Sequence, residues 1–374
     1  MKMIRLTQYC FLIIVFFSNC KQTFEPPVLQ ENLGALVVDG FINNSADTTF
    51  IRLSRTKRLS YLSENLSEHG ASLAVEDESG NVLYHFQELN ESGVYAVPGM
   101  VLDFNTKYRL RIFTTVGGEY ISDAIPVLKT PPIDSIGWVR DDKGVSIHVN
   151  THDPANNTHY YRWEYSETWQ YHASYISALI YDNGLRDRLA AEYVYECWKT
   201  QPSKQLLVAS TDRLSEDIIY HNTLRQIEQD AIELSTRYFI LIKQYALTKE
   251  YYQYLEDLKK ATEQTGSIFD VQPSALKGNI HAVNNKEEVV IGYLAASTVE
   301  TQKMFIKNEE VLPWRFRELC AIVDVTGDRV ESYFGKGAYV ALYFDNVRSV
   351  FIGTEAICAD CTKKGGILNK PDFW

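Results

Sequence analysis

The feature that most constrains this chain is a regular series of short apolar segments, separated by turn residues, between residues 33 and 130. Apolar and polar side chains alternate in segments such as Phe50–Ser54 and Tyr108–Phe113. This period of two places successive side chains on opposite faces of a strand. Turn residues such as Asp77–Gly80 end the segments. About seven short strands at this spacing predict a β-sandwich of the immunoglobulin, transthyretin or fibronectin type.

A second β region follows Thr130-Pro131-Pro132. Consecutive prolines lack the amide donors that a sheet requires, so they predict a domain boundary. Strand patterns resume from residue 133, and we expect a second sandwich-like domain over 133–374. Apolar spacing predicts a helical insertion over about 213–265, with one helix at 213–235 and a clearer one at 248–264, capped by Thr248. The fold class is therefore mainly β with a helical insertion, α+β overall, with two β-sandwiches in tandem.

Residues 1–19 have the features of an export signal. Basic residues precede an apolar run over 10–17, which is shorter than the roughly 20 residues that span a bilayer. The run ends just before Cys20, a pattern that resembles a bacterial lipoprotein signal in which this cysteine is lipidated and becomes the new N-terminus. Phe17 and Asn19 depart from the strict form of that signal. The alternatives are an ordinary signal peptide and an uncleaved helix. Residues 20–32 are then expected to tether the protein to the membrane.

Charge excludes some classes of partner. Loss of residues 1–19 leaves 355 of 374 residues and lowers the net charge from −11 to −13. An acidic surface argues against nucleic acid and against polybasic contact with a membrane. No later segment is apolar enough to cross a bilayer.

Four cysteines remain in the expected mature chain, and an even number in an exported protein favours disulfides. They are Cys197, Cys320, Cys358 and Cys361, for which three pairings are possible. The last two have the CxxC spacing of some redox and zinc sites. Zinc would require a second close pair, and a redox motif would require a βαβ context. We expect structural disulfides, no metal and no cofactor.

Seven aromatic residues between 160 and 175 are the candidate surface for a ligand or partner, since aromatic side chains suit such surfaces. They are Tyr160, Tyr161, Trp163, Tyr165, Trp169, Tyr171 and Tyr175. The alternative is that these aromatic residues belong to the core. Glu164 and Glu167 lie among them, but a strand would place this pair on opposite faces, which argues against a shared glycosidase site.

Several phrases resemble a family of outer-membrane surface lipoproteins that carry a domain of unknown function. They include Leu36–Gly40, Thr130–Ile136, Tyr160–Trp163, Gln244–Leu247, Gly266–Asp270, Cys358–Cys361 and Lys370–Trp374. The resemblance spans nearly the whole mature chain. It implies a lipid anchor in the outer membrane at the cell surface, beside a TonB-dependent receptor, and it implies no activity.

Three functions follow from these observations. The leading hypothesis is a non-enzymatic accessory in the capture or uptake of an unknown small molecule or glycan, because the sequence contains no catalytic set. The second is an adhesion or protein-interaction module. The third is an uncharacterised hydrolase, since a fold alone does not exclude catalysis.

Overall fold

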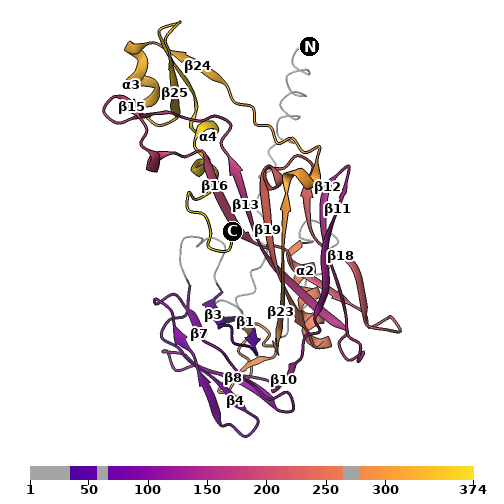
Figure 1. Ribbon diagram of the computed structural model, residues 1–374. Helices are drawn as coiled ribbons and strands as arrows, with labels where there is room; N and C mark the ends of the chain where they lie inside the picture. Colours follow the sequence, from indigo (N-terminus) through magenta and orange to yellow (C-terminus); the bar gives the residue numbers. More distant parts are fainter. Residues whose placement is uncertain (1–33, 57–65, 264–277) are drawn as a thin grey trace, which may run out of the picture.

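The computed structural model describes residues 34–56, 66–263 and 278–374, so Cys20 and the tether lie outside the described residues. The protein is mainly β, with several sheets and few short helices. Figure 1 shows three parts in a row: an N-terminal body, a middle body and a small sheet near the C-terminus at the opposite end. No helix within the described ranges is long and apolar enough to span a membrane.

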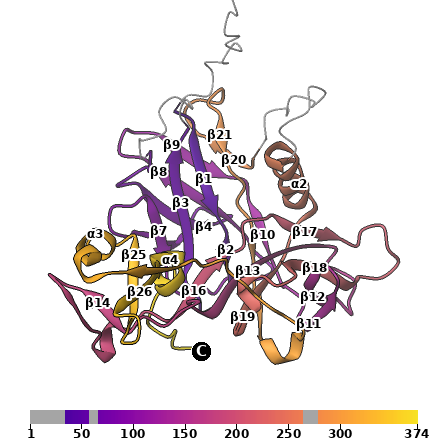
Figure 2. The same ribbon diagram turned by 90° about the horizontal axis from the view of Figure 1, so that it is seen from above.

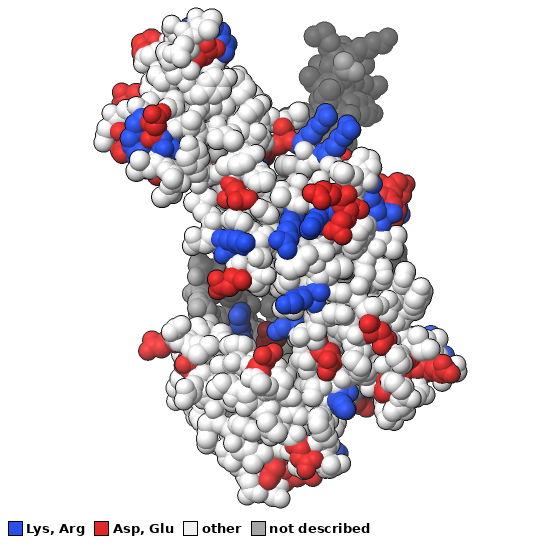
Figure 3. Space-filling model, in the orientation of Figure 1, with Lys and Arg blue, Asp and Glu red and all other residues white. Residues whose placement is uncertain are grey.

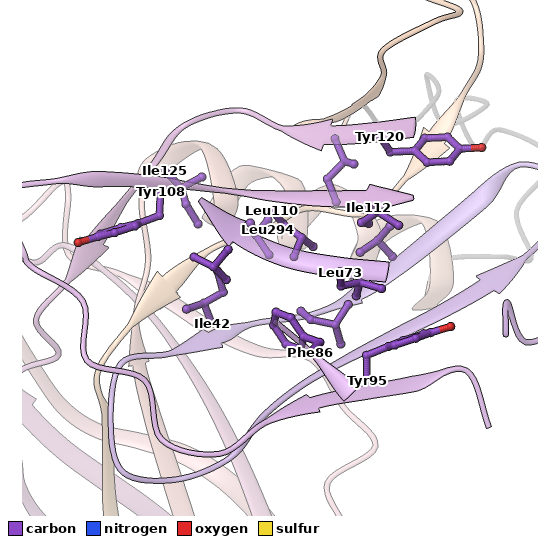
Figure 4. Packing of buried hydrophobic residues seen from close by; sticks show 14 of the residues in the cluster. Ile42, Leu73, Phe86, Tyr95, Tyr108, Leu110, Ile112, Tyr120, Ile125 and Leu294 are labelled. Atoms are coloured by element: carbon purple, nitrogen blue, oxygen red, sulfur yellow. The ribbon is translucent and has the colours of Figure 1, made fainter. Parts of the chain in front are cut away.

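Two sheets share one core in the N-terminal body, which we define as the described residues of 34–130 and 278–298. One sheet has the order β21-β1-β3-β7-β6 and the other β2-β22-β10-β8-β4-β5, with β9 between β8 and β20. Leu73, Tyr95 and Leu110 point into the shared core (Figure 4). The strands are β1 (Leu36–Gly40), β2 (Ile42–Asn43), β3 (Thr49–Arg55), β4 (Ser72–Asp77), β5 (Val82–His85), β6 (Gln87–Glu88), β7 (Val94–Val97), β8 (Lys107–Phe113), β9 (Glu119–Ser122) and β10 (Ile125–Leu128). The immunoglobulin, transthyretin or fibronectin type of sandwich stays a prediction.

A segment far along the chain completes this body. It contains three short strands. Strand β20 (Ile280–Ala282) pairs with β9, β21 (Val290–Ile291) pairs with β1, and β22 (Ala296–Ser297) pairs with both β10 and β2. The segment lies within the range that we expected for the second domain, and its strands belong to sheets of the first. Gly292 is required here, because its φ is +143° and a Cβ would lie 2.2 Å from the Val38 carbonyl oxygen.

The chain therefore crosses between the two bodies at two neighbouring places, residues 128–132 and 297–299. Buried Thr130 joins the crossings: its amide donates to Thr298 Oγ1 at 2.9 Å and its hydroxyl lies 3.2 Å from Ser297 Oγ. The Ala246 amide, from the middle body, donates to Thr130 Oγ1 at 3.0 Å.

Two further sheets form the middle body around a second core. The first has the order β11-β12-β18, and the second has the order β16-β13-β19-β23, with β17 also on β13. The strands are β11 (Ile133–Asp141), β12 (Gly144–His152), β13 (Tyr160–His172), β16 (Glu196–Pro202), β17 (Leu207–Ser210), β18 (Ile218–Glu228), β19 (Arg237–Ala246) and β23 (Val299–Lys307).

One of the two predicted helices is present. The helix α2 (Lys249–Glu263) confirms the prediction for 248–264, and the Tyr251 amide donates to the capping Thr248 hydroxyl at 3.2 Å. The prediction for 213–235 is wrong, because this region forms β18. Two register shifts between β12 and β18 interrupt its alternation. Its buried residues Ile219, Leu224 and Ile227 therefore follow at uneven spacings that resemble a helical pattern.

The C-terminal part packs a three-stranded sheet, β24-β26-β25, against the hairpin β14-β15. The elements here are β14 (Leu179–Tyr181), β15 (Leu185–Asp187), β24 (Ile322–Val325), α3 (Val330–Phe334), β25 (Tyr339–Asp345), β26 (Val350–Glu355) and α4 (Ala356–Ala359). Short 3-10 turns complete the described chain at Ala190–Glu192, Ile232–Leu234, Asn308–Val311, Gly327–Arg329 and Cys361–Lys364.

Two disulfides hold this part, and both form between the predicted cysteines. The long disulfide joins Cys197 to Cys361 across 164 residues, and the short disulfide joins Cys320 to Cys358 across 38 residues. The two cysteines of the CxxC spacing therefore belong to different disulfides.

Candidate functional site

Most of the predicted aromatic surface lies in the core. Strand β13 alternates between buried and partly exposed residues. Tyr161, Trp163, Tyr165, Trp169 and Tyr171 are buried in the core of the middle body. The surface interpretation is therefore wrong for these five residues, which belong to that core. Tyr160 and Tyr175, at the two ends of the cluster, are partly exposed.

The two glutamates of this cluster lie on opposite faces, as predicted. Glu167 is 2% exposed, within the core. It pairs with Arg225 at 3.0 Å and accepts hydrogen bonds from Tyr238 at 2.6 Å and Gln201 at 2.7 Å. Burial and the adjacent carboxylate raise the pKa of Tyr238 well above its ordinary value, so the phenol remains a donor. Glu164 points outward, so this pair does not form a glycosidase site.

The outward face of β13 forms one wall of a cleft of about 440 Å³ between the N-terminal and middle bodies. Figure 3 shows the molecule hollowed at this position, with Lys and Arg beside the opening. The cleft is lined by Asp39, Gly40, Phe41, Asn43, Thr48, Thr49, Phe50, Arg52, Val94, Arg162, Glu164, Lys243, Tyr245 and Val299. Its walls are thus the outer faces of two sheets that belong to different bodies.

The wall from the middle body holds a fixed arginine. Arg162 donates to the Tyr251 hydroxyl at 3.2 Å, pairs with Glu164, and lies 5.4 Å from the centre of the Tyr245 ring. The Tyr245 hydroxyl donates to Glu164 at 2.8 Å. Burial, and then the adjacent Glu164 carboxylate, raise the pKa of Tyr245. These contacts position the guanidinium before any ligand arrives.

Two further cations of the cleft, Arg52 and Lys243, have no ionic partner among the described residues. Arg52 lies opposite Asp39 in the β1–β3 register, and Lys243 lies opposite Glu164 in the β13–β19 register. Within the described ranges, neither Arg52 nor Lys243 forms an ion pair. Asn43 Oδ1 is buried and has no hydrogen-bond partner there. A ligand with anionic and hydroxyl groups could therefore bind without breaking an existing ion pair at either cation.

The four described cysteines do not provide a metal site. Among the described residues, the group with suitably close ligand atoms is Glu318, Cys320 and Cys358. Its two sulfurs are bonded to each other in the short disulfide. Thiolates are the zinc ligands, so this donor set does not fit a metal.

The fold and the cleft define a class of protein: a β protein of several sheets with a charged cleft between two bodies. A family model described as "Domain of unknown function (DUF4249)" matches residues 21–303, and the chain belongs to this family. No curated protein matches the sequence. A solved structure described as "Biofilm associated protein - BSP domain" aligns with 75% of this chain at 8% identity and a TM-score of 0.13. This chain covers 60% of that structure, and a likeness so weak supports no argument.

No local sequence pattern predicted the cleft. Its walls come from segments near residues 39–52, 162–164 and 243–245. One available signal was Arg162, a charged residue within the aromatic cluster, on the face opposite the buried rings.

Proposed function

We propose that this protein is a lipid-anchored, non-enzymatic protein of the outer-membrane surface. It would be anchored through Cys20 and would capture a small molecule or glycan in the cleft between its bodies. A TonB-dependent receptor beside it would then take up the ligand. The observation that supports ligand capture is the cleft itself. The fixed Arg162 converges there with Arg52 and Lys243, which form no ion pair with any residue that the structure describes.

The placement of the cations explains why this cleft suits reversible capture. Arg52 belongs to the N-terminal body and Lys243 to the middle body, so a ligand that reaches both would bridge the two bodies. Phe50 is 52% exposed on the same wall as Arg52 and offers an apolar contact. Polar groups that converge on a partly apolar cleft are typical of ligand sites.

Ligand binding is tested by a thermal-shift screen of sugar acids, sugar phosphates, amino acids and neutral oligosaccharides. We expect a compound that stabilises the wild type and fails to stabilise the Arg52→Ala/Lys243→Ala variant. The matched control is Lys303→Ala, which removes an exposed cation from the same sheet outside the cleft lining. Equal stabilisation of the wild type and the double variant would refute the assignment of the cleft.

The anchor and the receptor are tested separately. We expect the wild type to fractionate with outer membranes and Cys20→Ala to lose this association. Mild detergent extraction should recover a β-barrel receptor with the wild type. Recovery of the protein alone, under conditions that preserve such complexes, would refute the receptor partner.

A second candidate function is adhesion, favoured by exposed apolar residues on the small C-terminal sheet and in its β25–β26 turn. Tyr343 is 52% exposed, Phe344 41% and Val347 94%. Exposed apolar groups of this kind are typical of protein contacts. A ligand screen without hits, together with a protein partner lost on Val347→Asp, would favour adhesion over uptake.

A further inference from the structure

Three stacked rings stand on the outer face of the β11-β12-β18 sheet. The ring centres of His148 and His221 are 4.0 Å apart, and those of His221 and Tyr220 are 4.3 Å apart. His148, at the sheet, is 8% exposed, whereas Tyr220 is 75% exposed. The stack therefore begins on the sheet and ends with an aromatic ring in solvent.

The backbone is shaped to hold this stack. Gly137 lies opposite His148, and a Cβ there would be 2.8 Å from His148 Nε2, so glycine leaves room for the imidazole. His221 has a φ of 51°, and its amide donates to Asn150 Oδ1 at 2.7 Å. Register shifts between β12 and β18 lie on both sides of this region. Bulges of this kind re-aim side chains, and strained non-glycine residues concentrate at functional sites.

Among the described residues, the charged side chains of this face lie at the ends of its strands, with the Asp134–His152 pair at one end and Glu228 at the other. The strand register places these outward residues together: Ser135, Gly137, Val139, Ser146, Asn150, Thr223 and Gln226. By contrast, 23% of the residues of the whole chain are charged. The centre of this surface therefore offers hydroxyls, amides and aromatic rings without fixed charge.

Some of these polar groups bond to each other, and others have no hydrogen-bond partner among the described residues. Asn150 Nδ2 donates to Ser135 Oγ at 2.9 Å, and Ser146 donates to Gln226 Oε1. In the described part of the chain, neither the Thr223 hydroxyl nor the ring nitrogens of the two histidines make a hydrogen bond. Hydroxyls and imidazoles both donate and accept, as sugar hydroxyls do.

We propose that this face binds a neutral glycan, with the Tyr220 ring as a platform for one sugar ring and the nearby hydroxyl and imidazole groups as its hydrogen-bond partners. An aromatic face matches the apolar C–H face of a pyranose. The groups directly around the stack carry no fixed charge, so they suit a neutral ligand better than a charged one. The outer faces of the two middle-body sheets lie on opposite sides of a shared core, so this site is separate from the cleft (Figures 1 and 2).

The test is affinity electrophoresis of the full-length protein in mild detergent, through gels that contain a neutral mannan, xylan, glucan or galactan. Polygalacturonate is the anionic comparison. We expect at least one neutral polysaccharide to retard the protein, and Tyr220→Ala to weaken this retardation by about fivefold or more. Tyr220→Phe should retain it, because the ring is kept.

Two controls make the result specific. Tyr193→Ala removes an exposed tyrosine that lies outside this face and should leave retardation unchanged. Arg52→Ala/Lys243→Ala should also leave it unchanged, so failure of the cleft and failure of this site are distinguishable. Retardation by polygalacturonate alone, by no neutral polysaccharide, or equally with and without Tyr220 would overturn the proposal. Loss of retardation in the Arg52→Ala/Lys243→Ala variant alone would also overturn the proposal.

Discussion

Replacement of Glu167 by glutamine tests the reasoning about the middle core most directly. The substitution keeps the volume of the side chain and removes its charge. Glu167 is 2% exposed and is the closest partner of Arg225, which is 22% exposed and keeps a weaker contact to Glu233 at 3.4 Å. The loss of one partner from a buried ion pair costs about 3–5 kcal/mol. Arg225 keeps its contact with Glu233 and is partly exposed, so we expect a loss of free energy of unfolding at the lower end of this range, about 3 kcal/mol.

Tryptophan fluorescence follows this change in the correct part of the chain. All six tryptophans occur from residue 138 onward, so their signal reports the middle and C-terminal parts. A loss of about 3 kcal/mol should lower the melting temperature by about 6–12 °C in a unit of this size. Asp257→Asn, in an exposed pair with Lys260 on α2, should cause no measurable change. A shift for Glu167→Gln no larger than that of Asp257→Asn would refute the account of this network.

Three further predictions use the same fluorescence assay. Serine replacement of both cysteines of the long disulfide should lower the free energy of unfolding by about 1 kcal/mol more than the same change in the short disulfide, because the long disulfide closes a longer loop. The reverse order would contradict this. Burial, and then the nearby His221, lower the pKa of His148, so the unfolded state binds the proton first and stability should fall as pH drops below about 6.5. His148→Gln should reduce the loss of stability between pH 7.5 and 5.5. An unchanged loss would show that other groups cause it. Thr248→Ala should cost about 1 kcal/mol by removing the cap of α2, whereas unchanged stability would show that the cap contributes nothing.

Local patterns predicted the elements whose periodicity is undisturbed. The helix α2 was predictable because Tyr251 and Leu255 share one face with the residues around them and Thr248 precedes them. Strand β18 was not, because bulges break its period of two. The very short strands β20 to β22 belong to the N-terminal body through pairings with residues more than 150 positions away, which no local pattern encodes.

The candidate sites were harder to predict than the elements. Alternation along β13 shows which aromatic residues share a face, but not which face meets another sheet. The cleft and the ring stack both depend on the packing of distant strands. Glu164 and Glu167 were assigned to opposite faces correctly because that inference needed only the local period of one strand.

The paired crossings at residues 128–132 and 297–299 have a mechanical consequence. A single linker would let the two bodies rotate freely about the chain, whereas two adjacent linkers joined through Thr130 resist torsion. The bodies also share an apolar contact, because Phe41 of the N-terminal body packs edge-on against Tyr245 of the middle body, with ring centres 5.0 Å apart. These contacts hold the two walls of the cleft together, so Arg52 and Lys243 keep their relative positions.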